Sequence, residues 1–342
     1  MSEALALSNY RLPADWERQE AVWFAWPTHN NLWPSHLERV QARMAQLFCM
    51  VADFQPVYVL CPLENHSGLR EHLVGAEVML FDYRCDDVWC RDFGPLFLLN
   101  KSTQNLLVSD WRFNAWGEKY TPWTRDDQAA AWIANALKLS IKREKYVLEG
   151  GAIECNGAQV LLTTESVLLN SNRGEVFEKA TIERHLMEGL GISCIHWLKG
   201  GLAGDDTDGH IDNVARFYAE DAILYAAVPD AGHKDHAILA ENEQLIRQFT
   251  DSNGKRYRTK ALPMPDTIFV DGQIAAASYL NYLVLNGAVI FPSYGQTDKE
   301  GEVHCILGEC YPGRKILSFD CRDIIREGGA LHCLSQHQPA SA

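Results

Sequence analysis

The amino-acid sequence predicts an α/β fold made of five repeated cycles, each running from helix to strand, loop and hairpin. Three observations support this prediction. Five stretches carry apolar residues at helical spacing, and each is followed by a short extended segment. Asn-Gly pairs separate apolar strands at two places. The stretches EGGAIEC (149–155) and EGGALHC (327–333) match at five of seven positions, which indicates an internal repeat.

The helices are expected where apolar residues recur every three to four positions. The five candidate stretches are 35–53, 125–139, 176–189, 233–250 and 298–310. In the first of them the recurring apolar residues are Leu37, Val40, Met44, Leu47, Phe48 and Val51. The extended segments that follow the five helices read PVYVL, YVL, ISCIHWL, YRTKALP and KILSF.

Hairpins are expected at 152–163 and 279–294, because each has an Asn-Gly pair between two apolar runs, and Asn-Gly supplies the positive φ angles of a two-residue turn. Intervening hairpins argue against a simple doubly wound sheet of βαβ units. An α/β fold whose internal similarity arose by chance is the alternative. Because no Pro/Ser-rich linker divides the chain, we expect residues 1–342 to form one domain.

Composition excludes several classes of protein. The formal net charge of −14 argues against binding to nucleic acid, whose phosphates attract a basic surface. It is compatible with a cationic substrate, although excess carboxylates mostly serve solubility. No apolar run is long enough to cross a bilayer, and the first twenty residues do not resemble a signal peptide. We therefore expect a cytoplasmic protein whose ten cysteines are reduced and mostly buried thiols.

The first polar loop is DDVWCRDFGPLFLL (86–99), in which Asp87, Trp89 and Asp92 precede Gly94-Pro95 and an apolar strand. A tryptophan ring beside carboxylates can hold a cation, because the ring face attracts it and the carboxylate neutralises it. The alternative is a solvated loop at the start of a strand, with the tryptophan packed in the core.

The second polar loop is GDDTDGHIDNVARFY (204–218), with His210 and Asp212 two residues apart and Asp206 just before them. If a strand starts here, both side chains face the same way, and the carboxylate can orient the histidine for acid–base work. A cluster of His and Asp can also bind a metal, as can HKDH at 233–236. However, neither an HExxH motif nor paired cysteines accompany them, and HKDH fits the start of a helix.

The third stretch, EGGALHCLSQHQP (327–339), contains a cysteine that could act as a nucleophile. The glycine pair at 328–329 allows the backbone to approach a ligand closely. A thiol needs a partner that favours the thiolate. On an extended backbone, neighbouring side chains face opposite ways, so the expected base for Cys333 is His210 rather than the adjacent His332. The alternative is a buried structural thiol.

Taken together, these loops resemble one family over nearly the whole chain. The motifs are WFAWPTHNNLW (23–33), DDVWCRDFGP (86–95), LEGGAIECNG (148–157), LLTTESVLLNSNRG (161–174), DDTDGHIDN (205–213), ASYLNYLVLNGAVIFPSYG (277–295) and EGGALHCLSQHQP (327–339). They occur in the order seen in agmatine deiminases, which belong with the bacterial-type peptidylarginine deiminases in the guanidine-modifying superfamily. The lead-in to the terminal cysteine, with Ala330-Leu331, and Cys90 in the second motif depart from the family pattern.

The resemblance implies the pentein fold, a five-bladed pseudo-symmetric α/β propeller around a central active site. It also implies roles for six residues: Cys333 as nucleophile, His210 as general acid and base, Asp92 and Asp212 as the carboxylates that bind the guanidinium group, Trp89 in the substrate channel and Asp206 near the far end of the substrate. Of the two EGGA stretches, the family pattern favours Cys333 as the nucleophile and leaves Glu149 and Cys155 as supporting structure. Neither a metal nor an organic cofactor is implied.

The implied reaction is hydrolysis of a linear amidine, in which agmatine and water give N-carbamoylputrescine and ammonia on the way from arginine to putrescine. It proceeds through a covalent thiouronium on the cysteine. The implied partner is therefore a small cationic guanidino compound, with neither nucleic acid nor membrane involved, and the sequence does not decide whether the chain forms a homo-oligomer. The alternatives are a deiminase of arginine, peptidyl arginine or another guanidino compound, a guanidino-binding member without catalysis, and a metal-dependent hydrolase.

Overall fold

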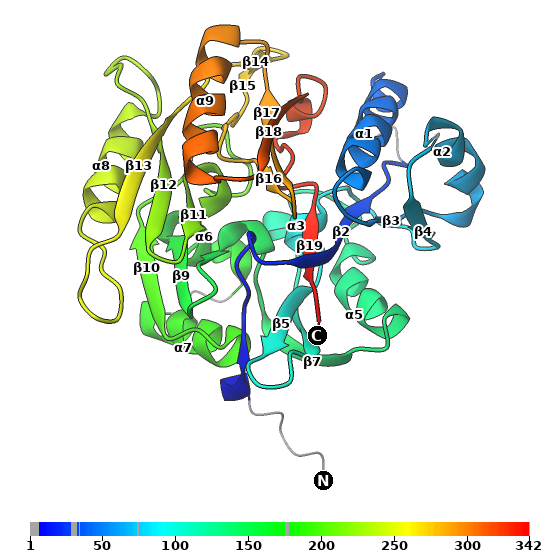
Figure 1. The fold of residues 1–342 in the computed structure, drawn as a ribbon, viewed down its shortest axis with the longest axis horizontal. Coiled ribbons are helices and arrows are strands. Elements are labelled where there is room, and N and C mark those ends of the chain that lie inside the picture. The colour runs from blue at the N-terminus through cyan, green and yellow to red at the C-terminus, as the bar shows by residue number, and fades with distance from the viewer. Residues whose placement is uncertain (1–6, 29–32, 34, 74, 175–177, 342) are drawn as a thin grey trace.

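The computed structural model describes residues 7–28, 33, 35–73, 75–174 and 178–341 (Figure 1). Residues 29–32 of the first family motif therefore lie outside the described residues. In Figure 1 the longer helices lie around the outside of the molecule, and the strands run beside them towards its middle. Among the described residues, no helix combines the length and the apolar character needed to span a membrane.

The five predicted helices are all present, with bounds that differ by a few residues. They are α1 (Leu37–Ala52), α5 (Asp126–Ala136), α7 (Lys179–Leu190), α8 (His236–Ile246) and α9 (Thr297–Cys310). In α1, Val40, Met44 and Phe48 are fully buried, and each contributes about 1.5–3 kcal/mol to folding by leaving water. The motif HKDH at 233–236 leads into α8, as predicted.

Four short helices were not predicted, because each is too short or too polar to show helical periodicity. They are α2 (His66–His72), α3 (Cys90–Phe93), α4 (Ala115–Glu118) and α6 (Glu165–Leu168).

Five sheets share one plan: an antiparallel pair of strands followed by a parallel pair. The first sheet has the order β5 (Leu96–Asn100), β6 (Leu106–Arg112) and β7 (Ser140–Val147). The second has β8 (Glu154–Cys155), β9 (Val160–Thr164) and β10 (Cys194–Leu198). The third has β11 (Ala215–Ala219), β12 (Ala222–Ala227) and β13 (Arg258–Pro263). A helix connects the two parallel strands in each case, so the predicted cycles correspond to real structural units.

The fourth and fifth sheets follow the same plan. They contain β16 (Leu283–Val284), β17 (Ala288–Ser293) and β18 (Lys315–Asp320), and β19 (Gln336–Pro339), β2 (Gln19–Ala25), β3 (Val57–Leu60) and β4 (Val78–Phe81). The last strand, β19, thus pairs with β2 from the start of the chain. Short strand β1 (Tyr10–Arg11) adds to the edge of β5, and β14 (Phe269–Val270) and β15 (Gln273–Ile274) form a small separate ribbon.

Both predicted hairpins are confirmed as antiparallel pairs, β8 with β9 and β16 with β17. Their turns differ from each other. Gly157 has the expected positive φ of +75°, whereas neither Asn286 nor Gly287 has a positive φ. The side chain of Asn286 instead binds the backbone of Gln19 at both N–H and C=O, so this Asn-Gly pair ties the hairpin to β2.

Candidate active site

One hollow of about 550 Å3, here called the Cys333 hollow, collects the predicted site residues Trp89, Asp92, Asp206 and Cys333 at its wall. His210 and Asp212 lie directly behind that wall and are fully buried. The other lining residues are Asp87, Trp116, Tyr120, Thr207, Asn213, Glu327, Gly328 and Gly329. The structure therefore brings all six predicted residues to one place.

Each of the five sheets contributes a residue from the segment just before its antiparallel strand. These residues are Asp92 before β5, Gly151 before β8, Asp212 before β11, Asn281 before β16 and Cys333 before β19. Because the five sheets share one plan, equivalent segments of the repeat converge on a common centre. This arrangement explains why polar motifs far apart in sequence meet.

Cys333 is buried and in contact with two polar side chains. Its Sγ lies 3.0 Å from Nδ2 of Asn281 and 3.6 Å from Oδ2 of Asp212. Asn281 also accepts hydrogen bonds from the backbone N–H groups of His332 and Cys333 through its Oδ1, so it fixes the cysteine loop. Burial, followed by the charges of Asp212 and Asp92, raises the pKa of Cys333 well above its ordinary value. A cation bound between these carboxylates reverses their effect and favours the thiolate.

Asp92, on α3, is held by two donors. The backbone N–H of Gly151 donates to Oδ1 at 3.0 Å, and the indole N–H of Trp116 donates to Oδ2 at 3.1 Å. Burial raises the pKa of Asp92 to about 6, and the nearby charges of Asp212 and Glu149 act in the same direction. A carboxylate that is costly to ionise in the empty site is well suited to receive a cationic ligand.

His210 lies between two carboxylates, with Nδ1 3.6 Å from Asp92 Oδ1 and Nε2 4.0 Å from Glu149 Oε2. Neither ring nitrogen has a hydrogen-bond partner, although the ring is buried. Such a ring is free to exchange a proton with a bound molecule. The Glu149 carboxylate is itself paired with Arg173 at 2.9 Å, so it is held in place beside the imidazole.

The expected strand geometry at His210 and Asp212 is wrong. The segment Ile211–Asn213 is a 3₁₀ turn with His210 at its N-cap, and residues two apart on a turn with three residues per revolution do not share a face. The two side chains accordingly point to different partners: His210 to Asp92 and Glu149, and Asp212 to His332 and Cys333.

The expected extended backbone at His332 and Cys333 is also wrong, because residues 331–334 form turns. His332 nevertheless directs its ring away from the thiol. Its Nδ1 contacts Asp212 Oδ2 at 2.8 Å, and its Nε2 contacts Asp15 Oδ2 at 2.9 Å. Burial raises the pKa of Asp212, but the hydrogen bond and charge of His332 outweigh burial, and the resulting pKa lies below the ordinary value. The contact with His332 thus favours the ionised form of Asp212.

The outer part of the Cys333 hollow is acidic and aromatic. Asp87, Asp206 and Glu327 line it together with Trp89 and Tyr120, whose hydroxyl donates to Asp206 at 2.7 Å. Withdrawal from water raises the pKa of Asp87 and of Glu327 to about 7 each. Glu327 is the more exposed of these two carboxyl groups, so water reduces its shift most.

Trp89 belongs both to the core and to the wall of the hollow. It packs in the core against Trp33, with ring centroids 6.3 Å apart, and it also lines the hollow. An added Cβ on Gly329 would lie 2.3 Å from the Trp89 ring, so only glycine allows this approach.

Cys155, in the other EGGA stretch, lies elsewhere. Its Sγ contacts the carbonyl of Leu12, and burial raises its pKa to about 12. It lines a second hollow that shares no residue with the Cys333 hollow. All ten cysteines are free thiols, and seven of them are buried.

Several residues of this site escaped prediction from sequence. Asn281 and Trp116 carry no local signal, because their importance depends on contacts with residues more than twenty positions away. Glu149 was assigned to supporting structure, yet its carboxylate lies beside His210. The repeated EGGA sequence was the available signal, since it places Glu149 and the glycines at a position equivalent to that of the cysteine loop.

Comparison with known proteins agrees with this geometry. The family model for Porphyromonas-type peptidyl-arginine deiminases matches residues 11–339. An agmatine deiminase of Pseudomonas aeruginosa (strain LESB58) is 32% identical in an alignment of 355 positions, which covers 97% of this chain and 96% of that protein.

Solved structures are similar over the same extent. The agmatine deiminase of Enterococcus faecalis superposes with a TM-score of 0.93 at 28% identity, over 99% of this chain and 98% of that one. A cysteine-to-serine variant of the agmatine deiminase of C. jejuni with substrate bound has a TM-score of 0.89 at 27% identity and covers 97% of both chains. From the family model and the full-length similarity, we conclude that this chain belongs to the Porphyromonas-type peptidyl-arginine deiminase family.

Proposed function

We propose that this protein is an agmatine deiminase, which hydrolyses agmatine to N-carbamoylputrescine and ammonia. The observation that carries the proposal is the charge of the Cys333 hollow. Among its described lining residues are four carboxylates, Asp87, Asp92, Asp206 and Glu327, and no lysine, arginine or histidine. A linear dication fits this distribution, with its guanidinium end at Asp92 and its ammonium end at the outer carboxylates.

The same distribution disfavours arginine as substrate. Free arginine carries an α-carboxylate close to the α-ammonium group, and this carboxylate would meet Asp87, Asp206 or Glu327 without a cationic partner in the hollow. Lys119 lies nearby, but it is already engaged by Asp208 and by the backbone carbonyl of Asp206. The names of the full-length relatives support agmatine independently.

In the proposed mechanism, Asp92 and Asp212 bind the planar guanidinium group, which matches carboxylates in paired hydrogen bonds. These contacts place the central carbon of the guanidinium group beside the sulfur of Cys333. The bound cation lowers the cost of forming the thiolate, and the N–H of Asn281 donates to the sulfur. The sulfur attacks the carbon and forms a tetrahedral adduct.

His210 then donates a proton to the departing amino group, which leaves as ammonia, and a covalent thiouronium remains on Cys333. Water attacks the same carbon after giving a proton to His210. The C–S bond then breaks, the hydroxyl proton of this second adduct passes to solvent, the thiolate returns, and the neutral ureido product leaves. The carboxylate of Glu149 stabilises the imidazolium that forms in the second step.

The proposal extends to the architecture. We propose that the five units form one catalytic domain, a pseudo-symmetric five-bladed α/β propeller around the Cys333 hollow. The shared plan of the five sheets and the pairing of β19 with β2 support it. We also place the protein in the cytoplasm, since free thiols suit a reducing compartment.

The test is an assay for the ureido product, using wild type, Cys333→Ala and, as a matched control from the other EGGA stretch, Cys155→Ala. We expect activity on agmatine in wild type and in Cys155→Ala and none in Cys333→Ala. Mass spectrometry of quenched wild type should find an adduct on Cys333. Undiminished activity in Cys333→Ala would overturn the assignment of the nucleophile. A higher kcat/KM for arginine or an arginyl peptide would overturn the assignment of the substrate, and tight binding of agmatine without turnover would overturn catalysis.

A further inference from the structure

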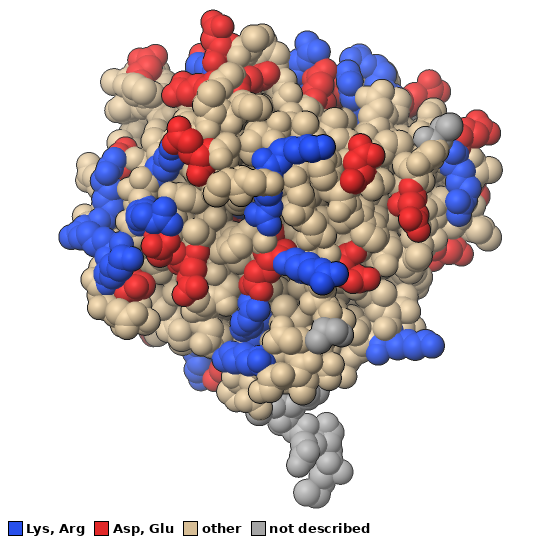
Figure 2. Space-filling view, in the orientation of Figure 1, with Lys and Arg blue, Asp and Glu red and all other residues tan. Residues whose placement is uncertain are grey.

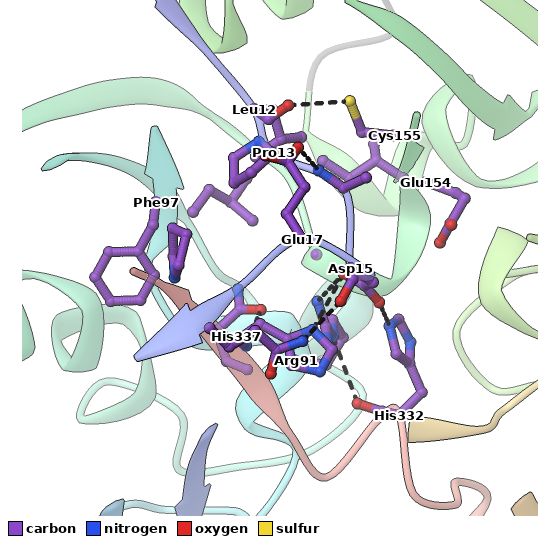
Figure 3. Close-up of a pocket in the computed structure, with 17 residues that line it drawn as sticks. Leu12, Pro13, Asp15, Glu17, Arg91, Phe97, Glu154, Cys155, His332 and His337 are labelled. Atoms are coloured by element: carbon purple, nitrogen blue, oxygen red, sulfur yellow. Dashed lines mark hydrogen bonds and ion pairs between the residues drawn. The ribbon is translucent and has the colours of Figure 1, made fainter. Parts of the chain in front are cut away.

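His332 links two carboxylates on opposite sides of its ring. Its Nδ1 lies 2.8 Å from Asp212 Oδ2, and the ring is buried. Its Nε2 lies 2.9 Å from Asp15 Oδ2, and Figure 3 shows this contact. At such distances nitrogen and oxygen repel each other unless a proton lies between them. Asp15, His332 and Asp212 are therefore linked in one continuous hydrogen-bonded chain, here called the Asp15 triad.

The Asp15 triad ends at the nucleophile. Oδ2 of Asp212, the atom that accepts from His332, is also the atom 3.6 Å from Sγ of Cys333. Its other oxygen, Oδ1, is buried and has no hydrogen-bond partner. The contact with His332 therefore fixes the orientation of this carboxylate and leaves one oxygen free for a ligand.

Asp15 comes from the N-terminal segment between β1 and β2, far in sequence from the other members. Arg216 donates to its Oδ2 at 2.6 Å, and Nδ1 of His337 lies 3.1 Å from its Oδ1. Asp15 lines the second hollow, of about 560 Å3, together with Arg91, Glu154 and His337 (Figure 3). One end of the Asp15 triad thus faces a hollow distinct from the Cys333 hollow, and the other end faces Cys333.

Oxygen and nitrogen atoms of Asp15, Glu154 and His332 come within 4.8 Å of one another, as ligands of a metal do. However, the guanidinium of Arg216 already binds both carboxylates, at 2.6 Å to Asp15 and 2.7 Å to Glu154. The cation that this cluster requires is therefore a side chain of the protein, and the cluster serves to hold Asp15 rather than a metal ion.

We propose that Asp15 positions the guanidinium-binding carboxylate of Asp212 through His332, so that the N-terminal segment belongs to the active site. Asp15 and His332 are positioning residues: they act on the substrate only through Asp212. The inference rests on the proposed function, since it assigns Asp212 to the guanidinium group.

Two substitutions of His332 separate its two contacts. The amide nitrogen of asparagine can take the place of Nδ1, whereas that of glutamine can take the place of Nε2. His332→Asn therefore keeps a donor to Asp212 and loses the contact with Asp15. His332→Gln keeps the contact with Asp15 and loses the donor to Asp212. We expect kcat/KM for agmatine to fall about 100-fold in His332→Gln and about 10-fold in His332→Asn and in Asp15→Asn, by analogy with the loss of an outer-shell hydrogen bond.

The pH profile distinguishes positioning from simple structural support. Without the donor from His332, the pKa of Asp212 rises, so kcat/KM in His332→Gln should fall more steeply on the acidic side than in wild type. Asp15→Asn should change the acidic side in the same direction by a smaller amount. The matched control is Glu17→Gln, which lies on the same segment and loses its ion pair with Arg11 but touches no member of the Asp15 triad. We expect it to retain the wild-type profile.

Alkylation of Cys333 by iodoacetamide across the same pH range gives a readout that does not require turnover. If wild type fails to process agmatine, the proposed function fails, while a changed alkylation profile in His332→Gln and Asp15→Asn still supports the Asp15 triad. Equal losses in His332→Asn and His332→Gln, wild-type profiles in folded Asp15→Asn, or an equal loss in Glu17→Gln would each overturn the inference. Circular dichroism identifies any variant that fails to fold, and Asp15→Asn then decides the outcome.

Discussion

Gly151 is the residue at which the smallest possible change should disturb the site most. It is the second glycine of the first EGGA stretch. A Cβ added there would lie 2.5 Å from Nδ1 of His210 and 2.7 Å from Oδ1 of Asp92. Ordinary contacts begin at 3.4 Å, so in Gly151→Ala the two groups must retreat by about 0.9 and about 0.7 Å, the differences between 3.4 Å and the two distances.

Both groups are buried, and Asp92 is held by hydrogen bonds from Gly151 and Trp116, so a retreat disturbs the contacts that place them. Misplacement of catalytic groups by about 1 Å can reduce the rate about 100-fold, and overpacking of a buried site costs about 1–3 kcal/mol of stability. We therefore expect Gly151→Ala to lower kcat/KM for agmatine about 100-fold. The free energy of unfolding should fall by about 1–3 kcal/mol, so that the protein stays folded.

Steady-state kinetics and calorimetric unfolding measure the two effects separately. Gly301→Ala is the matched control, since Gly301 lies within α9 and an added Cβ meets nothing within 4 Å. It should leave kcat/KM unchanged and stabilise the protein by about 0.5–1 kcal/mol. Wild-type kcat/KM in Gly151→Ala would refute the placement of His210 and Asp92 around this glycine.

Three further predictions concern the walls of the hollow. Glu327→Gln should raise KM for agmatine about fivefold at pH 8 with little change in kcat, since a partly exposed charge pair contributes about 1 kcal/mol; an unchanged KM would count against the ammonium site. In wild type, KM for agmatine should rise as pH falls through about 7, because Asp87 has its pKa there and only its ionised form attracts the substrate; a pH-independent KM between 6 and 8 would contradict this. Iodoacetamide at about pH 7.5 should label the exposed Cys305 faster than Cys333, whose pKa is raised, and peptide mass spectrometry that finds the reverse order would disprove it.

The repeating units could be predicted from sequence because their signals are local. Val40, Met44 and Phe48 recur on one face of α1, and burial of that face is what makes the stretch a helix. The residues of the site could be located for a different reason, since their motifs match a family. Their roles stay predictions until tested.

The geometry within the loops could not be predicted, because it depends on tertiary contacts. His210 and Asp212 lie on a 3₁₀ turn rather than a strand, and the packing of neighbouring segments decides between the two. Trp116 adopts a positive φ of +57°, which a sequence pattern does not indicate, and in this conformation its indole N–H reaches Asp92. Asp15 illustrates the same limit, since its partners His332 and Arg216 are more than 200 positions away.

Figure 2 shows acidic and basic side chains intermixed on one face of the molecule, without a continuous basic surface. The concentration of one sign of charge is instead internal, at the Cys333 hollow.

The pairing of β19 with β2 has a consequence for the protein while it is being synthesised on the ribosome. Cys333 stands three residues before β19, and among the described residues that strand pairs only with β2, which lies more than 300 residues earlier. Four of the five loops can be in place before the last segment emerges, yet none of them carries Cys333, the proposed nucleophile. We therefore expect the protein to react with guanidino compounds only after synthesis has passed residue 339. A nascent or interrupted polypeptide should be inactive.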